Sequence, residues 1–489
     1  MNTKRIVVWT LIGLAVAWLP ATYLMGGPIE RRYNEYVDAL VKALPMAQVV
    51  ERSYDRGIID SRARLTLRLK ETGVVGTGKI GRPDGKTARP AALPSFTITL
   101  DDLIHHGPFP DTLLPAGSRI RSTLSATPLA GDAADAKPLP DAAPITLLTA
   151  DTRFGFGSSY RSTLNSPARQ WKSDDGKLAI DWQGFEGSAD GDAHSHEGRF
   201  AMRSPGLKAL IDDGTGKGEI TVGKIEGETE RSAGDPLELT AGQTRLVVDA
   251  LRFRWQRAGQ AESVGEFDDL RMRSTITRNG EFADLETRGT GKGRIDKETI
   301  DRIEYVEHWK RLHAPTLERV THRILDRMGR TSDGDSVDKA AFERLSAAIA
   351  DDLKGLLPHN PEYAVAPLSL TLNGTPGSIG WRIQLEGLKD YDPRQPPLHL
   401  LAGLKAGFDL KAPRVWVEKL AELAAGGEKT PIPSAQLTDL VRQGEMMGFL
   451  RNDNGVLTSE VRLDGGRLQV NGKELFNLAA LPQPRRPSR

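Results

Sequence analysis

Side chains that alternate between apolar and polar recur along more than half of this chain. In SRARLTLRLK, residues 61–70, every second residue is alanine or leucine, and arginine and threonine stand between them. A strict period of two predicts a β-strand with one buried and one solvated face, because successive side chains of a strand point to opposite sides. The same pattern recurs at 95–100, 118–124, 177–182, 218–225, 244–255 and 270–277. With Gly, Pro, Asn and Asp between them, these segments predict an antiparallel β-rich region over residues 49–295.

The pattern changes after Asp296. Apolar residues spaced by three and four, such as Phe342, Leu345 and Ile349, predict a helical region over residues 296–360. Strand patterns then return, and two alternating runs around Asp464-Gly465-Gly466 predict a closing hairpin. We therefore expect a β/α C-terminal region over residues 361–480 and a disordered basic tail at 481–489. The predicted fold class is α+β and β-rich, with a large antiparallel sheet that is curved or elongated.

The N-terminal segment predicts attachment to a membrane. Residues 6–25 carry no charge, and as a helix they would span roughly 30 Å, the thickness of a bilayer's hydrocarbon core. Lys4 and Arg5 precede them, so residues 1–27 are predicted to form a cytoplasmic tip and a single transmembrane helix. The alternative is a cleaved signal peptide ending near Ala15-Val16-Ala17. Residues 28–48 are predicted to form an amphipathic helix.

Several kinds of chemistry find no support in the residues. The chain has no cysteine, and 66 basic against 65 acidic side chains give a net charge of +1, which does not favour nucleic-acid binding. The segment GVVGTGKI, residues 73–80, resembles a phosphate-binding loop, but Ile80 stands where a hydroxyl residue should hold Mg²⁺. Its GTGK is repeated at 214–217 and 289–292. We therefore expect no nucleotide, and interpret these glycines as strand ends or bulges.

The histidines and carboxylates give no catalytic or metal-binding pattern. His194 and His196 share one face if they lie on a strand, but a metal ion would need a third ligand from elsewhere. Paired carboxylates such as Asp101-Asp102 are common at the ends of elements and in loops. We therefore predict no enzyme, no metal ion and no cofactor.

Three short motifs resemble those of the YdgA family, bacterial envelope proteins of largely unknown function. The first follows the apolar N-terminal run, the second follows an alternating strand, and the third lies in the closing hairpin. They comprise Tyr54, Arg56, Gly57 and Ser61; His106, Gly107 and Pro108; and Gly466, Val470, Asn471, Gly472 and Lys473. The resemblance implies an inner-membrane anchor, a periplasmic body and a capacity for self-association, but no known reaction.

These motif residues also have structural interpretations. Gly57 can adopt a backbone conformation that other residues avoid, and Asn471-Gly472 suits a tight turn. Arg56 is the exception, because a fixed guanidinium can bind a phosphate or carboxylate through two hydrogen bonds.

Two functions from different classes remain open, beside an enzyme of unrecognised type. The first is a non-enzymatic envelope scaffold or interaction module, held at the inner membrane through residues 6–25, with a homo-oligomer or another envelope protein as partner. The second is lipid binding or transfer along an apolar β-groove, by analogy with AsmA-like proteins. A continuous apolar groove would favour the second, and a sheet face closed by the helices of residues 296–357 would oppose it.

Overall fold

The computed structural model describes most of the chain outside its termini and several connections. The described residues are 26–38, 40–41, 47–69, 96–107, 110, 116–129, 143–173, 176–212, 214–235, 238–257, 259, 261–330, 339–388, 403–416 and 434–477. The predicted membrane segment at 6–25, the GTGK copy at 73–80, Pro108 and the tail at 481–489 lie outside these residues.

Nearly all of the described chain is β-structure. The strands are β1 (Ala47–Arg56), β2 (Asp60–Leu69), β3 (Phe96–His106), β4 (Ser118–Pro128), β5 (Ile145–Phe154), β6 (Ser159–Ser166), β7 (Arg169–Lys172), β8 (Leu178–Trp182), β9 (Phe185–Asp192), β10 (Gly198–Ser204), β11 (Leu207–Asp212), β12 (Gly216–Val222), β13 (Ile225–Arg231), β14 (Gly242–Arg257), β15 (Ser263–Asn279), β16 (Phe282–Ile295), β17 (Glu298–His313), β18 (Glu362–Leu372), β19 (Thr375–Leu385), β20 (Leu404–Pro413), β21 (Arg451–Asp453), β22 (Val456–Asp464), β23 (Arg467–Val470) and β24 (Lys473–Asn477). The helices are a short N-terminal helix at residues 26–38, α2 (Ala314–Arg330), α3 (Lys339–Leu353), the 3₁₀ helix η1 (Lys354–His359) and α6 (Ser434–Met446).

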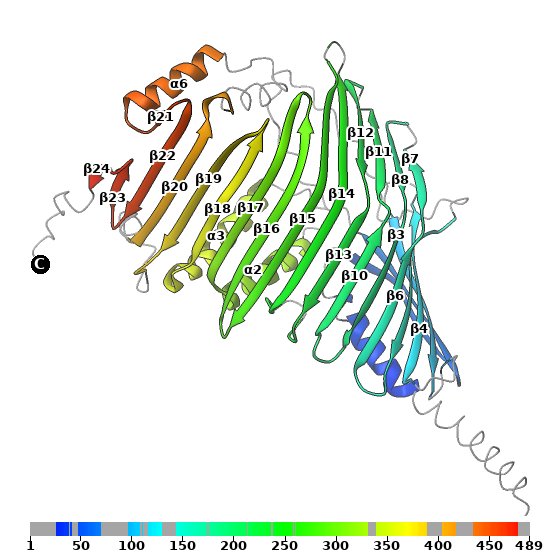
Figure 1. Ribbon diagram of the computed structural model, residues 1–489. Helices are drawn as coiled ribbons and strands as arrows, with labels where there is room; N and C mark the ends of the chain where they lie inside the picture. The colour runs from blue at the N-terminus through cyan, green and yellow to red at the C-terminus, as the bar shows by residue number, and fades with distance from the viewer. Residues whose placement is uncertain are drawn as a thin grey trace, which may run out of the picture.

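All these strands belong to one antiparallel sheet, which confirms the predicted sheet type. Strands β1 to β6 pair in chain order, and β14 to β20 do the same. Between these two series the sheet divides into two branches that both end on the long strand β14. One branch runs through β9, β10 and β13, and the other through β7, β8, β11 and β12. Figure 1 shows the resulting open, twisted sheet.

The two faces of the sheet differ in chemistry. Leu246, Met272 and Gly289 lie opposite one another on β14, β15 and β16, and we call the face they share the apolar face. Their sequence neighbours on the other side are Arg245, Arg273 and Arg288, which define the charged face. None of the residues of β14 is buried, so this central strand is held by its neighbours in the sheet and not by a second layer.

The N-terminal helix covers one end of the apolar face. Val37 and Tyr33 of this helix pack with Ala63, Leu65 and Ile104 of β2 and β3 into the largest buried cluster that the structure describes. The helix was predicted to extend over 28–48, but Ala47 already belongs to β1. Pairing with β2 takes these residues into the sheet.

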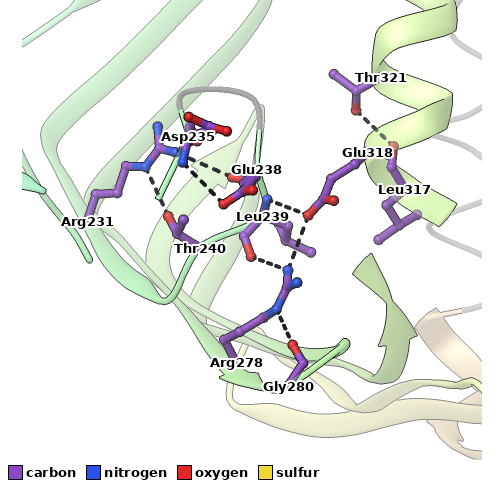
Figure 2. A network of polar contacts seen from close by, with 10 residues as sticks. All are labelled: Arg231, Asp235, Glu238, Leu239, Thr240, Arg278, Gly280, Leu317, Glu318 and Thr321. Atoms are coloured by element: carbon purple, nitrogen blue, oxygen red, sulfur yellow. Dashed lines mark hydrogen bonds and ion pairs between the residues drawn. The ribbon is translucent and has the colours of Figure 1, made fainter. Parts of the chain in front are cut away.

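Helix α2 is fixed to the sheet by one carboxylate. The Glu318 side chain accepts hydrogen bonds from the Leu239 backbone N–H and from the Arg278 guanidinium, both at 3.3 Å. Arg278 also donates to the carbonyl oxygens of Leu239 at 2.8 Å and Gly280 at 2.6 Å (Figure 2). This network joins α2 to β15 and to the connection between β13 and β14, and in Figure 1 α2 and α3 lie behind β16 to β18.

The helix predicted for the start of the 296–360 region is wrong. Residues 298–313 form strand β17, which pairs along its length with β16 and β18. Ile300 and Ile303 lie opposite Gly293 and Gly291, so one extra residue is inserted between them. This bulge gives the two isoleucines a spacing of three, which resembles the spacing of a helix. The helices of this region begin only at Ala314.

The transmembrane helix in the predicted fold class also needs correction. Within the described part of the chain, no helix is long and apolar enough to cross a membrane. The helix at residues 26–38 is about 20 Å long and carries Glu30, Arg31 and Arg32, which suits a surface helix better than a membrane span. The described fold is therefore one antiparallel sheet with short helices.

Two glycines of the apolar face test how tightly its side chains pack. A Cβ added to Gly265 would lie 2.1 Å from the Phe253 ring, whereas one added to Gly289 would meet nothing closer than 3.7 Å. We expect Gly265→Ala to destabilise the protein by about 1–3 kcal/mol through overpacking, and Gly289→Ala to have little effect. Urea unfolding followed by circular dichroism measures both, and equal midpoints for the two variants would contradict this packing.

Candidate functional site

An uninterrupted row of apolar side chains crosses the sheet from β7 to β16. Cross-strand partners lie on the same face, and each residue of the row is opposite the next. The row consists of Trp171, Ile180, Ala209, Ile220, Phe253, Gly265 and Ile295. At about 4.8 Å between strands, its seven members span roughly 29 Å. Ile295 lies on the same side of β16 as Gly289, so this row belongs to the apolar face.

The corresponding row on the other side of the same strands is polar throughout. It consists of Gln170, Asp181, Lys208, Thr221, Arg252, Glu266 and Arg294. Within it, Arg252 pairs with Asp268 at 3.2 Å and Arg294 with Glu266 at 3.1 Å. The contrast between the two faces therefore extends over all the strands of these rows and is not a property of single residues.

A second apolar row extends farther, from β6 to β20. It consists of Leu164, Gly187, Met202, Gly227, Leu246, Met272, Gly289, Tyr305, Leu368, Ile379 and Leu410. The next row on this face carries the hydroxyls of Thr229, Thr244, Ser274 and Thr287, which pair with one another at 3.3 Å. The apolar face remains accessible, since Met272 is 39% exposed and Ile383 is 44% exposed.

Large rings lie flat over glycines on this face. The positions of added Cβ atoms put the Trp255 ring on Gly218, the Phe253 ring on Gly265 and the Phe267 ring on Gly293. Such pairs cover exposed backbone with aromatic surface. The aromatic rings therefore fill the space above these glycines on the apolar face.

The two GTGK copies among the described residues are parts of strands and of a turn. At 289–292, Gly289 and Gly291 lie on the apolar face, while Lys292 points to the charged face and pairs with Asp269 at 3.1 Å. At 214–217 the sequence connects β11 to β12, and Lys217 lies 3.8 Å from Asp212.

The first two family motifs come together under the N-terminal helix. The Ser61 hydroxyl lies 3.0 Å from Nε2 of His106, and both side chains are buried. The Tyr54 ring packs against the Tyr33 ring of the helix in a tilted arrangement, with ring centroids 5.5 Å apart. Burial raises the pKa of Tyr54. The motifs therefore fix the helix to β1, β2 and β3.

The other residues of these motifs serve the same contact. The Arg56 guanidinium lies against Gly26 and Gly27 at the start of the helix and 3.9 Å from Glu30. A Cβ on Gly57 would lie 2.1 Å from the Asp60 carbonyl oxygen, so close backbone approach explains this glycine. The predicted positive φ does not apply to it, whereas Gly107 has φ of 114°.

Ser61 and His106 resemble a nucleophile with its base, but each is only 1% exposed. A substrate carbonyl cannot reach the Ser61 oxygen in this arrangement. The pair therefore acts as a buried hydrogen bond between β2 and β3.

Asp102 is the buried carboxylate of this region and lies inside β3, whereas the sequence pattern had indicated an acidic pair at the end of an element or in a loop. Tyr33 donates a hydrogen bond to it at 2.7 Å. Burial raises the pKa of Asp102, while hydrogen bonds from Ser122 and Tyr33 oppose that rise. The sequence could have predicted this burial. Asp102 alternates with Leu100 and Ile104, so its side chain lies on the same face of β3 as these two residues of the apolar cluster.

The third motif lies at the other end of the sheet (Figure 1) and does not join the first two. The Asn471 side chain accepts a hydrogen bond from the Glu460 N–H at 2.9 Å and donates to the Gly448 carbonyl at 2.7 Å. It connects β22 to the segment after α6. Gly466 and Gly472 have φ of 76° and 78° in the adjoining turns, Val470 is 2% exposed, and Lys473 begins β24.

A hollow with both polar and apolar lining adjoins this motif. Its volume is about 450 Å³, and its lining includes Lys411, Arg451, Glu460 and Asn471. Arg451 donates to the Asn471 carbonyl. Acidic and basic groups occur together in this lining, so it does not select for one charge of ligand.

No group of three His, Cys, Asp or Glu side chains converges among the described residues. His194 and His196 lie in the turn between β9 and β10, where the Asp192 carboxylate accepts hydrogen bonds from the backbone N–H groups of His194 and Ser195.

The Tyr33 hydrogen bond gives a test of the N-terminal contact. Tyr33→Phe should destabilise the protein by about 1–3 kcal/mol at neutral pH, because Asp102 would stay buried without this donor. The bond favours the ionised carboxylate, so its loss raises the Asp102 pKa further, and the effect should shrink as the pH falls and Asp102 takes up a proton.

Tyr36→Phe is the control, since Tyr36 is 59% exposed on the same helix. Thermal unfolding at several pH values measures both variants. A loss for Tyr33→Phe no greater than that for Tyr36→Phe would contradict a stabilising role of the bond.

Asn471 offers a test at the opposite end. Asn471→Ala should cost about 2–4 kcal/mol, because two backbone groups lose their partners and alanine is unfavourable at a φ of 52°. Asn454→Ala is the matched control, since Asn454 has a φ of 53° and measures the backbone cost alone, about 1 kcal/mol. Chemical denaturation gives the difference, which should vanish if the side-chain bonds of Asn471 contribute nothing.

Comparison with known proteins gives one match. A family model described as a bacterial protein of unknown function, DUF945, matches residues 1–476. No curated protein and no solved structure matches the chain.

Proposed function

Because the chain belongs to DUF945, a family of bacterial proteins of unknown function, we propose its function from the geometry of its sheet. The protein is a binding protein and not an enzyme, and its ligand is lipid, whose acyl chains lie along the apolar face. The observation that carries this proposal is the uninterrupted apolar row from Trp171 to Ile295.

An exposed apolar surface of this extent indicates a binding partner. Monomeric soluble proteins rarely expose apolar patches larger than a few hundred Å². Here Trp171, Met272 and Ile383 are each more than a third exposed, and they lie on three different strands of the apolar face. Transfer of acyl chains from water to this face would remove apolar surface from water on both partners.

The chemistry of the row favours lipid over a protein partner. A protein interface combines an apolar centre with about one hydrogen bond per 100–200 Å². The row from Trp171 to Ile295 offers almost no donor or acceptor over roughly 29 Å, a length close to that of a bilayer's hydrocarbon core. Aromatic rings cover the backbone at the glycines, which adds apolar surface for acyl chains.

The helices cover two parts of the apolar face. The N-terminal helix covers the apolar face at β1 to β3, and α2 is attached near the end of β15. Met272 and Ile383 are nevertheless 39% and 44% exposed, so the apolar face stays accessible at these two positions.

We place this activity in the bacterial envelope, with the body in the periplasm and residues 6–25 as the point of association with the inner membrane. The support is the motif resemblance to the YdgA family. Cell fractionation and protease accessibility of the body in intact spheroplasts test this location.

Replacement of one exposed residue tests the lipid site. Met272→Glu puts a charge between Leu246 and Gly289, and burial of that charge under acyl chains is unfavourable. We expect the full-length variant to co-purify with several-fold less phospholipid than the wild type in native mass spectrometry.

Arg273→Glu is the matched control, because it introduces the same side chain one residue away on the charged face. Wild-type protein without bound lipid, or equal losses in the two variants, would contradict the proposal. Co-purification of a stoichiometric envelope protein without lipid would instead favour a scaffold.

A further inference from the structure

A carboxylate and four aromatic side chains gather on the apolar face of β17, β18 and β19. Glu307 lies on β17 between Tyr305 and Trp309, two residues from each. Across the sheet, Tyr363 of β18 is opposite Trp309, and Trp381 of β19 lies in the same row as Glu307. The rings of Tyr305, Trp309 and Tyr363 lie around the Glu307 carboxylate. Trp381 lies two strands away, on the far side of Val365, and the acid and the four aromatic residues are all partly exposed.

The side chains contact one another in this cluster. The Trp309 indole N–H donates to the Glu307 carboxylate at 2.9 Å. The rings of Trp309 and Tyr363 have centroids 4.1 Å apart. Burial, followed by the nearby Glu307 carboxylate, raises the pKa of both Tyr305 and Tyr363, so their hydroxyls stay neutral beside the acid.

The charge of Glu307 is not balanced within the described structure. None of the described cations forms an ion pair with it. By contrast, the charged face of the same region pairs its acids: Glu304 with Arg302, Glu286 with Arg288, and Glu362 with Lys310. A carboxylate on a largely apolar surface therefore faces the proposed ligand without a counter-ion from those residues.

We propose that Glu307 and the rings of Tyr305, Trp309, Tyr363 and Trp381 bind the ammonium group of an amine-bearing lipid. This inference rests on the proposed lipid-binding function and specifies the head group. Aromatic faces attract alkylammonium ions through their quadrupoles, and such cages with an acid recognise quaternary ammonium ligands. Glu307 supplies the compensating charge.

Apolar residues next to the ammonium site can contact the acyl chains of such a lipid. Ile383 lies opposite Tyr363 on one side of the Glu307 row and is 44% exposed, and Leu368 lies opposite Ile379 on the other side of that row. Acyl chains that leave the ammonium site therefore meet apolar side chains at once. A metal ion is a poorer occupant, because Glu307 has no second and third ligand from the described His, Asp or Glu residues.

The test uses the full-length protein and two kinds of probe. The first probe is tetramethylammonium, which tests the ammonium site in the absence of lipid. It is titrated into the protein, and its binding is followed by saturation-transfer NMR. Lipid preference is measured by incubation with vesicles that contain equal amounts of phosphatidylethanolamine and phosphatidylglycerol, followed by mass spectrometry of the bound lipid.

Glu307→Gln should weaken tetramethylammonium binding about tenfold and abolish the preference for the amine lipid, while total bound lipid stays near the wild-type amount. Glu304→Gln, an acid-to-amide change on the charged face of the same strand, should alter neither. Trp309→Leu should weaken tetramethylammonium binding as well, because it removes one ring.

The outcomes separate the two proposals. If the wild type binds lipid without preferring the amine head group and ignores tetramethylammonium, the ammonium site is wrong and the lipid-binding function stands. If it binds tetramethylammonium but no lipid, the proposed function is wrong and the site takes a free amine. Equal behaviour of Glu307→Gln and Glu304→Gln would also overturn the site.

Discussion

The register of one antiparallel ladder is the constraint on which the rest of this structure depends. A slip of one residue between any two strands would move the side chains of one strand to the opposite face. The ladder contains bulges, including one between Asp268 and Arg271 with a φ of 53° at Asp269. Phe267 and Met272 are five residues apart, so strict alternation would put their side chains on opposite faces. The extra residue of this bulge keeps both on the apolar face. Local irregularity thus preserves a long-range pattern.

The central part of the sheet is stabilised mainly within the sheet and not by a buried core. The central strand β14 has no buried residue, so hydrogen bonds and cross-strand side-chain contacts contribute more than a closed core does. Buried clusters occur where the N-terminal helix covers β2 and β3 and where Trp416 packs against Ile300 of β17 and Leu372 of β18. A sheet built in this way can leave the middle of one face open to a ligand and still remain folded.

Sequence patterns predicted the strands of the sheet more reliably than the clusters of side chains that form on its surface. Period-two runs identified strands such as β2 and β14, because alternation follows directly from strand geometry. They failed at β17, where a bulge gave Ile300 and Ile303 a helical spacing. The motif residues Ser61 and His106 were found, but their buried contact was not. Glu307 was missed altogether, since its aromatic neighbours Tyr363 and Trp381 come from other strands.

The sequence by itself determined that this chain forms amphipathic antiparallel strands, because alternation fixes the two faces of each strand without reference to its partners. It also placed glycines at Gly289, Gly291 and Gly293, whose spacing of two is a strand property. Only the tertiary structure decided which strands are neighbours. That pairing joined the apolar faces into one surface and brought the Tyr363 ring beside Glu307, because contacts between distant segments depend on register, which no local pattern encodes.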